Sequence, residues 1–132
     1  MLDDMGIFRT TIRVANVSRP AAFRELVDVM VDTGSEYNWI PAAILVTLDV
    51  QPVRIDPFET ADGRVLQREV GYALISAADR AMASVVVFAA PGDMTLLGAI
   101  GLESLNLKID LGRKELVPAG PVPVAALVET FP

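Results

Sequence analysis

Apolar and polar residues alternate along much of this chain, which is the pattern of half-buried β-strands. In the first such run, residues 7–17, Ile12 and Val14 are separated by Arg13. The second run, 23–31, is rich in β-branched valine, which favours extended structure. Both runs are therefore predicted to be strands.

Two longer extended runs follow in the middle of the chain. Residues 53–60 and 65–76 are joined by Ala61-Asp62-Gly63-Arg64, and Asp-Gly between two strands is a strong hairpin signal. A second reversal at 77–80 leads into 82–90, a continuous apolar run that reads as a buried strand. A long hairpin followed by a core strand is predicted.

One short helix is predicted, after the turn at 91–93 and the apolar pair Leu96-Leu97. Its signal is the spacing of apolar residues within 100–107. The segment 41–45 stays open between a helical turn and the start of a strand, because propensity and periodicity disagree there. Apart from these segments the fold class is all-β.

The C-terminal part divides at Pro118. A last strand pair is predicted at 108–111 and 115–117, and the proline-rich stretch beyond it favours extended backbone. We expect one domain over 1–118 and an arm or tail over 119–132, with 122–131 either laid on a partner or disordered.

Composition narrows the chemistry. The chain has 132 residues, a net charge of −6, no cysteine and no histidine. These counts fit a single globular domain and exclude disulfides, thiolate or imidazole catalysis and most zinc hydrolase chemistry. No metal, no cofactor and no nucleic acid partner is expected.

Targeting signals are also not expected from the sequence. The acidic first five residues do not look like a secretory signal, and the most apolar stretch, 81–90, is too short to span a bilayer. We expect no membrane span and a cytoplasmic protein.

The most informative motif is Asp32-Thr33-Gly34-Ser35, which directly follows a predicted strand. By itself an Asp-Thr-Gly triplet is as readily an inert turn, in which the carboxylate bonds its own backbone. A glycine behind the aspartate also lets another backbone approach the carboxylate closely. The triplet alone leaves both interpretations open.

Other segments extend the motif. Asp32-Thr33-Gly34-Ser35 followed by Trp39-Ile40-Pro41 resembles the catalytic loop of pepsin-type aspartic proteases, and Leu96-Leu97-Gly98 resembles their downstream apolar-apolar-Gly segment. The hairpin lies between the two, where retroviral proteases have their flap. Over residues 7–118 the chain is most similar to the single-domain, retropepsin-like bacterial members of this clan.

That resemblance implies a closed acid-protease barrel, a flap hairpin and a homodimer in which each chain supplies one catalytic aspartate, Asp32. Thr33 would bond to the partner's loop, the carbonyl of Gly34 would contact a peptide or protein substrate, and the Ser35 hydroxyl would favour the charged carboxylate. Residues Ala61, Asp62, Gly63 and Arg64 would form the substrate-binding flap tip. The activity implied is aspartic endopeptidase, a hydrolase.

Several residues depart from the retroviral pattern or have a plainer interpretation. The flap tip carries Asp62 and Arg64 instead of apolar residues and glycines, and Ala99 stands where retroviral members often have an arginine that would pair with an acid such as Glu36. Leu96 and Leu97 are expected to be core residues next to the active site, and Tyr37 and Trp39 to pack in the core or at its rim.

Two alternatives to the protease remain at this level. The same fold can serve as a non-catalytic dimeric or peptide-binding module, since fold alone does not specify function. Asp32 can also be an ordinary turn residue of an unrelated β-barrel. The second alternative leaves the ordered series of motifs as coincidence.

Overall fold

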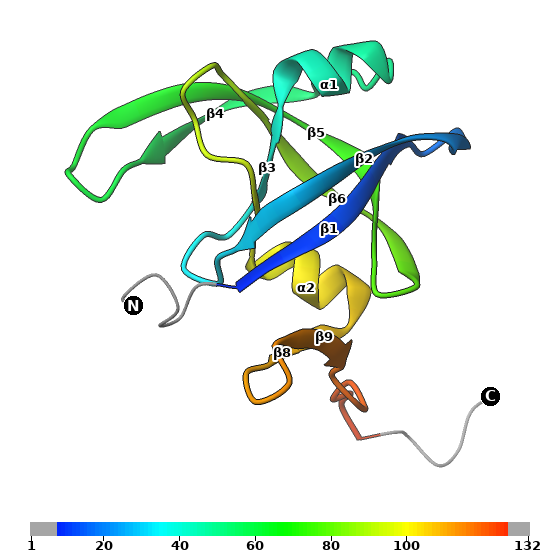
Figure 1. Cartoon of the computed structure of the whole chain (residues 1–132). Helices are drawn as coiled ribbons and strands as arrows, with labels where there is room; N and C mark the ends of the chain where they lie inside the picture. The colour runs from blue at the N-terminus through cyan, green and yellow to red at the C-terminus, as the bar shows by residue number, and fades with distance from the viewer. Residues whose placement is uncertain (1–7, 127–132) are drawn as a thin grey trace.

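A computed structural model describes residues 8–126 (Figure 1). Within these residues the chain forms nine strands and two short helices. They are β1 (Phe8–Asn16), β2 (Arg19–Val31), β3 (Asn38–Pro41), α1 (Ala42–Thr47), β4 (Arg54–Glu59), β5 (Val65–Ala77), β6 (Arg80–Ala89), β7 (Leu96–Leu97), α2 (Ala99–Leu105), β8 (Leu107–Asp110) and β9 (Glu115–Pro118). The predicted all-β class is confirmed.

Six strands of the main sheet close into a ring. The strand order is β1-β2-β7-β3-β6-β5-β4, and β1 also pairs with β5. The ring closes because β1 pairs with β2 on one edge and with β5 on the other. The strand β4 lies outside the ring and, within residues 8–126, pairs only with β5. A closed sheet of this kind removes most exposed strand edges.

The interior of the ring is apolar. The largest fully buried side chains include Ile12, Ile40, Ile75, Leu97 and Leu105, each less than 2% exposed. Burying one such side chain contributes roughly 1.5–3 kcal/mol. Leu97 and Leu105 place the segment after residue 95 in the same core as β1, so the start and the end of the domain depend on one another.

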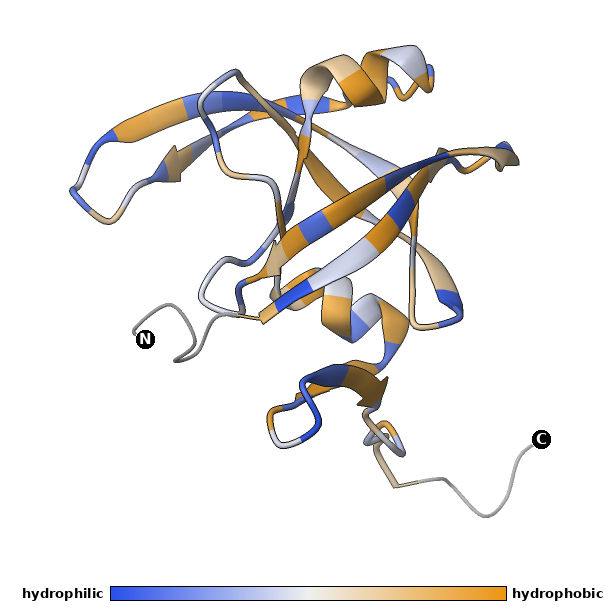
Figure 2. Cartoon of the chain, viewed as in Figure 1, coloured by the Kyte–Doolittle hydropathy of each residue, from blue (hydrophilic) through white to orange (hydrophobic). Residues whose placement is uncertain are grey.

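The predicted hairpin is formed by β4 and β5. Its pairs run from Arg54 opposite Val70 to Glu59 opposite Val65, leaving residues 60–64 as the tip. The hairpin reaches out from the ring (Figure 1), and polar and apolar residues alternate along it (Figure 2). Among the described residues, the hairpin therefore has one free edge strand, β4.

Most element boundaries differ from the sequence prediction by one or two residues, and two differences are larger. The strand expected from residue 23 begins at Arg19, because the turn before it is only Val17-Ser18 and is held by Asn16 Oδ1, which accepts the Ser18 N–H at 2.9 Å. The segment 41–45, left open above, contains both structures: β3 ends at Pro41 and α1 begins at Ala42. The chain therefore has a second helix beside the predicted one, α2.

The C-terminal strand pair, β8 and β9, is formed as predicted. Residues 119–126 form no helix or strand, and the remainder of the predicted arm, 127–131, lies outside the described residues. No helix within residues 8–126 is long and apolar enough to cross a membrane.

Candidate active site

Asp32 lies where β2 ends, and a strand from far downstream holds it there. Met30 and Val31 pair in parallel with Leu96 and Leu97 of β7, and the Asp32 N–H donates to the Leu97 carbonyl at 3.0 Å. Leu97 is fully buried and Leu96 is 5% exposed. The two motifs seen in the sequence are thus direct neighbours in space.

The loop after Asp32 fixes the orientation of its carboxylate. Oδ1 accepts the Gly34 N–H at 2.9 Å, Oδ2 accepts the Ser35 hydroxyl at 3.4 Å, and the Asp32 carbonyl accepts the Ser35 N–H at 3.1 Å. The carboxylate is half-buried. Both of its oxygens therefore have a donor from the loop, while one side of the group faces open space.

Gly98 allows the loop that follows Asp32, residues 33–37, to lie against the start of α2. A methyl group at this position would lie against the Tyr37 carbonyl oxygen and 2.8 Å from the Ser35 carbonyl oxygen. The same approach lets the Ala99 N–H donate to Ser35 O at 2.8 Å and the Ile100 N–H to Glu36 O at 2.9 Å. Glycine at position 98 is needed for this contact.

Replacing Gly98 by alanine is expected to lower the free energy of unfolding by about 2 kcal/mol, because overpacked sites cost about 1–3 kcal/mol. Gly112→Ala is the matched control, since a methyl there meets nothing closer than 3.5 Å. Urea unfolding of both variants measures the difference. An equal effect of the two substitutions would show that the close approach at Gly98 is not what stabilises the loop.

Asn38 is a supporting residue that the sequence analysis did not single out. It is 0% exposed; its amide donates to Ser84 Oγ at 2.9 Å and to Val85 O at 2.8 Å, and its carbonyl accepts the Gly98 N–H at 3.0 Å. This one side chain therefore connects β3, β6 and the Gly98 turn. In the sequence, the only sign that Asn38 supports the site is its position as a polar amide next to large apolar residues.

A cleft of about 770 Å³ opens over Asp32. The Asp32 loop forms one side of it, with Gly34 and Ser35, and the tip of the hairpin contributes Ala61 and Arg64. The remaining wall is largely apolar and comes from strands and from the loop before β7: Met30, Trp39, Phe58, Leu66, Met94 and Leu96. Thr33, Asp62, Gly63, Leu97 and Gly98 do not line it.

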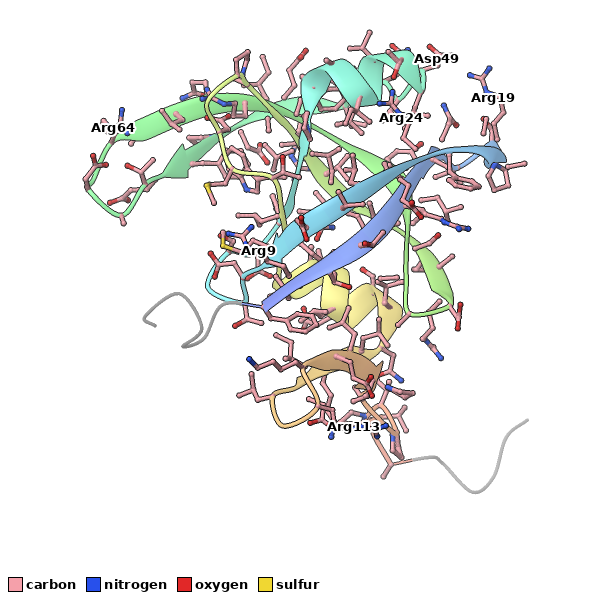
Figure 3. All side chains as sticks on the ribbon, in the orientation of Figure 1. Arg9, Arg19, Arg24, Asp49, Arg64 and Arg113 are labelled. Atoms are coloured by element: carbon pink, nitrogen blue, oxygen red, sulfur yellow. The ribbon has the colours of Figure 1, made fainter. Side chains whose placement is uncertain are left out.

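The hairpin tip is held by its own hydrogen bonds. The Thr60 N–H donates to Arg64 O at 2.8 Å, and Gly63 has a φ of 86°, which favours glycine. The Thr60 hydroxyl donates to the Asp62 carboxylate, and the Arg64 guanidinium forms an ion pair with the same carboxylate at 3.2 Å. These two bonds lower the pKa of the exposed Asp62 carboxyl. Arg64 lies close to the tip (Figure 3).

A salt bridge links β5 of the hairpin to the loop before β7, which lines the cleft. Arg68 of β5 donates Nε and an Nη to the two carboxylate oxygens of Asp93, at 2.7 and 3.0 Å. Asp93 Oδ2 also accepts the Ala90 N–H at 2.7 Å. The side chains are only 20% and 13% exposed. The hydrogen bond from Arg68 lowers the pKa of Asp93 more than burial raises it.

Asp93→Asn is expected to reduce the free energy of unfolding near pH 7 by about 1.5–3 kcal/mol, since hydrogen bonds to charged groups contribute about that much. Because the pKa of Asp93 is lowered on folding, its contribution is present above the ordinary value of 3.8 and is lost as pH falls through the folded value. The difference between wild type and variant should therefore shrink from pH 7 to pH 3 in urea unfolding. A difference independent of pH would point to packing instead of charge.

Solved structures of similar fold include a viral protease. The solution structure of the protease of simian foamy virus (mac) matches with a TM-score of 0.50 and 19% identity over 72% of this chain and 91% of that chain. The fold is retropepsin-like. No protein-family model and no curated protein sequence matches the chain.

Within this retropepsin-like fold, the position occupied by Ala99 carries no arginine to pair with Glu36. Glu36 is exposed and forms no ion pair with any residue in 8–126. Instead, the backbone carbonyl of Glu36 accepts a hydrogen bond from the Ile100 N–H. The loop after Asp32 is thus held against α2 by main-chain hydrogen bonds and by the Asn38 side chain, not by an ion pair of Glu36.

No group of three or more acidic residues within 8–126 is arranged to hold a metal ion. The titratable group at the floor of the cleft is Asp32, with Glu59, Arg64 and Asp93 around the rim. The chemistry that this retropepsin-like chain can offer at the cleft is that of a fixed carboxylate.

Proposed function

We propose that the protein is an aspartic endopeptidase of the single-domain bacterial type, active as a homodimer. The observation that carries the proposal is Asp32: a carboxylate fixed by donors on both oxygens, at the floor of a cleft that is covered on one side by a hairpin. One chain supplies one such carboxylate. Two copies related by a two-fold axis would supply a pair.

The proposed mechanism uses the pair to activate water. Two carboxylates brought close together cannot both ionise easily, so they share one proton over a range of pH. The ionised Asp32 acts as the base toward a water molecule, and the protonated Asp32 of the partner polarises the scissile carbonyl. The water then attacks the carbonyl carbon, and a proton passes to the leaving nitrogen.

The hairpin supports the binding of an extended peptide. Because β4 is an edge strand, its outer N–H and C=O groups are available to another strand, and β-strand addition is a common mode of peptide binding. We propose that the tip, with Ala61 and Arg64 over the cleft, closes on the bound peptide as a lid, while Asp62 and Gly63 shape the turn. The substrate is a peptide or an extended protein segment.

The first test is cleavage of a degenerate peptide library between about pH 4 and 7, the range that a shared proton favours. The second test asks whether two chains build one site. When wild type is mixed with an equal amount of Asp32→Asn and subunits exchange at random, only about a quarter of the dimers retain two aspartates. Activity per wild-type chain should fall to about half, and unchanged activity would contradict a shared site.

A non-catalytic peptide-binding module remains the competing function. It requires the cleft and the hairpin, but it does not require Asp32 to be ionisable. Peptide binding without cleavage, at concentrations where sedimentation shows a dimer, would support this alternative.

A further inference from the structure

A second compartment opens beside the cleft, on the side away from Arg64. It has a volume of about 430 Å³ and lies between the loop Gly34–Tyr37 and the segment Asp56–Glu59. It shares Gly34, Ser35, Trp39, Phe58 and Glu59 with the main cleft, so the two spaces are direct neighbours. We call this compartment the side pocket. A peptide that passes Asp32 would reach it within a few residues.

Aromatic rings form the apolar part of the side pocket. Phe58 packs edge-on against Trp39, with ring centroids 5.1 Å apart, and against Tyr37 at 5.9 Å. All three rings line the pocket. Such rings pack well against the methylene stem of a long side chain, and their faces attract cations.

The charged residues lining the side pocket are all acidic: Glu36, Asp56 and Glu59. Asp56 is neutralised by Arg54, whose Nε donates to it at 2.8 Å. Glu36 and Glu59 form no ion pair with any residue in 8–126. Two uncompensated carboxylates therefore border a pocket with aromatic walls.

The main cleft differs in its chemistry. Its walls near Asp32 carry Met30, Leu66, Met94 and Leu96, and its acids without an ion pair to any residue in 8–126 are Asp32 itself and Glu59, which is shared with the side pocket. Apolar side chains thus suit the space over Asp32, whereas a long side chain with a cationic end suits the side pocket. The two spaces would select different residues of one peptide.

We propose that the side pocket binds a lysine or arginine side chain of the peptide, and so selects substrates with a basic residue near the cleavage site. This proposal rests on the proposed function of the cleft. The stem of the side chain packs on Phe58 and its neighbouring rings, and the cationic end lies between Glu36 and Glu59. In a two-fold dimer the pocket occurs twice, once on each side of the scissile bond.

Trp39 provides a direct binding signal, because it is the only tryptophan of the chain and lines both spaces. Its fluorescence is followed while two peptides are added to the full-length chain. The peptides have the same apolar residues and differ only in a lysine or a methionine. The lysine peptide should bind about tenfold more tightly, from two partly exposed ion pairs and a cation–π contact.

The charge is then removed from the pocket. Glu36→Gln/Glu59→Gln should abolish the preference for the lysine peptide, while Glu69→Gln/Glu103→Gln, which removes two exposed carboxylates elsewhere, should retain it. The preference should also weaken at high salt. Equal affinity for the two peptides, or a preference that survives in the pocket variant, would overturn the proposal.

Cleavage is measured on the same peptides to separate this proposal from the proposed function. A lysine preference in binding with no Asp32-dependent cleavage would support the side pocket and contradict the endopeptidase. Asp32-dependent cleavage without any basic preference would do the reverse. If neither peptide binds or is cleaved, both proposals are wrong.

Discussion

Asp32→Asn is expected to reduce peptide cleavage by about 1,000-fold or more, within the range that general acid–base catalysis contributes. Asparagine has nearly the same shape, and its carbonyl oxygen can still accept the Gly34 N–H that Asp32 Oδ1 accepts at 2.9 Å. It cannot take a proton from water. The loss should therefore fall on the rate of cleavage and leave the folded structure intact.

The matched control for this experiment is Asp110→Asn. Asp110 also ends a strand, is half-buried, and accepts a backbone N–H, that of Arg113, at 3.0 Å. It lies in the β8–β9 pair and lines none of the spaces described above. Peptide cleavage and thermal unfolding are measured for both variants. If Asp32→Asn retained cleavage, or unfolded the protein, the catalytic assignment would fail.

Asn38→Ala is expected to have the largest effect on stability, a loss of about 3 kcal/mol or more. The substitution removes the Asn38 side chain from the buried Gly98 N–H and the part-buried Val85 C=O, and an unsatisfied buried group costs about 1–3 kcal/mol. Ser84 is affected less, because its hydroxyl also bonds to Ser104 at 3.2 Å. Guanidinium or urea unfolding measures the loss.

Asn16→Ala serves as the comparison for Asn38→Ala. The Asn16 amide also bonds to two backbone carbonyls, those of Leu48 and Asp49, but near the surface, where water can replace it. A smaller loss is expected for this variant. Equal losses for Asn38→Ala and Asn16→Ala would mean that burial of the amide adds nothing to its effect.

Local signals in the sequence were sufficient for most of the fold. The pair Asp62-Gly63 correctly predicted the hairpin. A tight turn between two strands needs residues that accept a positive φ, and Asp-Gly is a common choice. The alternation of apolar and polar residues around Ile12 and Val14 predicted β1, because neighbouring side chains of a strand point to opposite faces. The helix α1 was left open against a strand, because its six residues are too few to show a helical period.

Only part of the candidate site could be predicted from the sequence. Asp32 and Leu96-Leu97-Gly98 were identified through a resemblance, since nothing local states that they meet. Asn38 with Ser84 and Arg68 with Asp93 join residues 46 and 25 positions apart. A single sequence holds no record of such distant pairs, so neither the Asn38 amide beneath the Asp32 loop nor the salt bridge between the hairpin and the loop before β7 could be predicted.

The parallel pairing of β2 with β7 has a consequence for when the site can exist during synthesis. Asp32 is held by the carbonyl of Leu97, and Gly98 and Ala99 follow directly against its loop. A nascent chain that ends before Leu97 lacks the strand that positions the carboxylate. Whatever chemistry Asp32 performs, a growing chain therefore cannot present this fixed carboxylate before the ribosome has added Leu97.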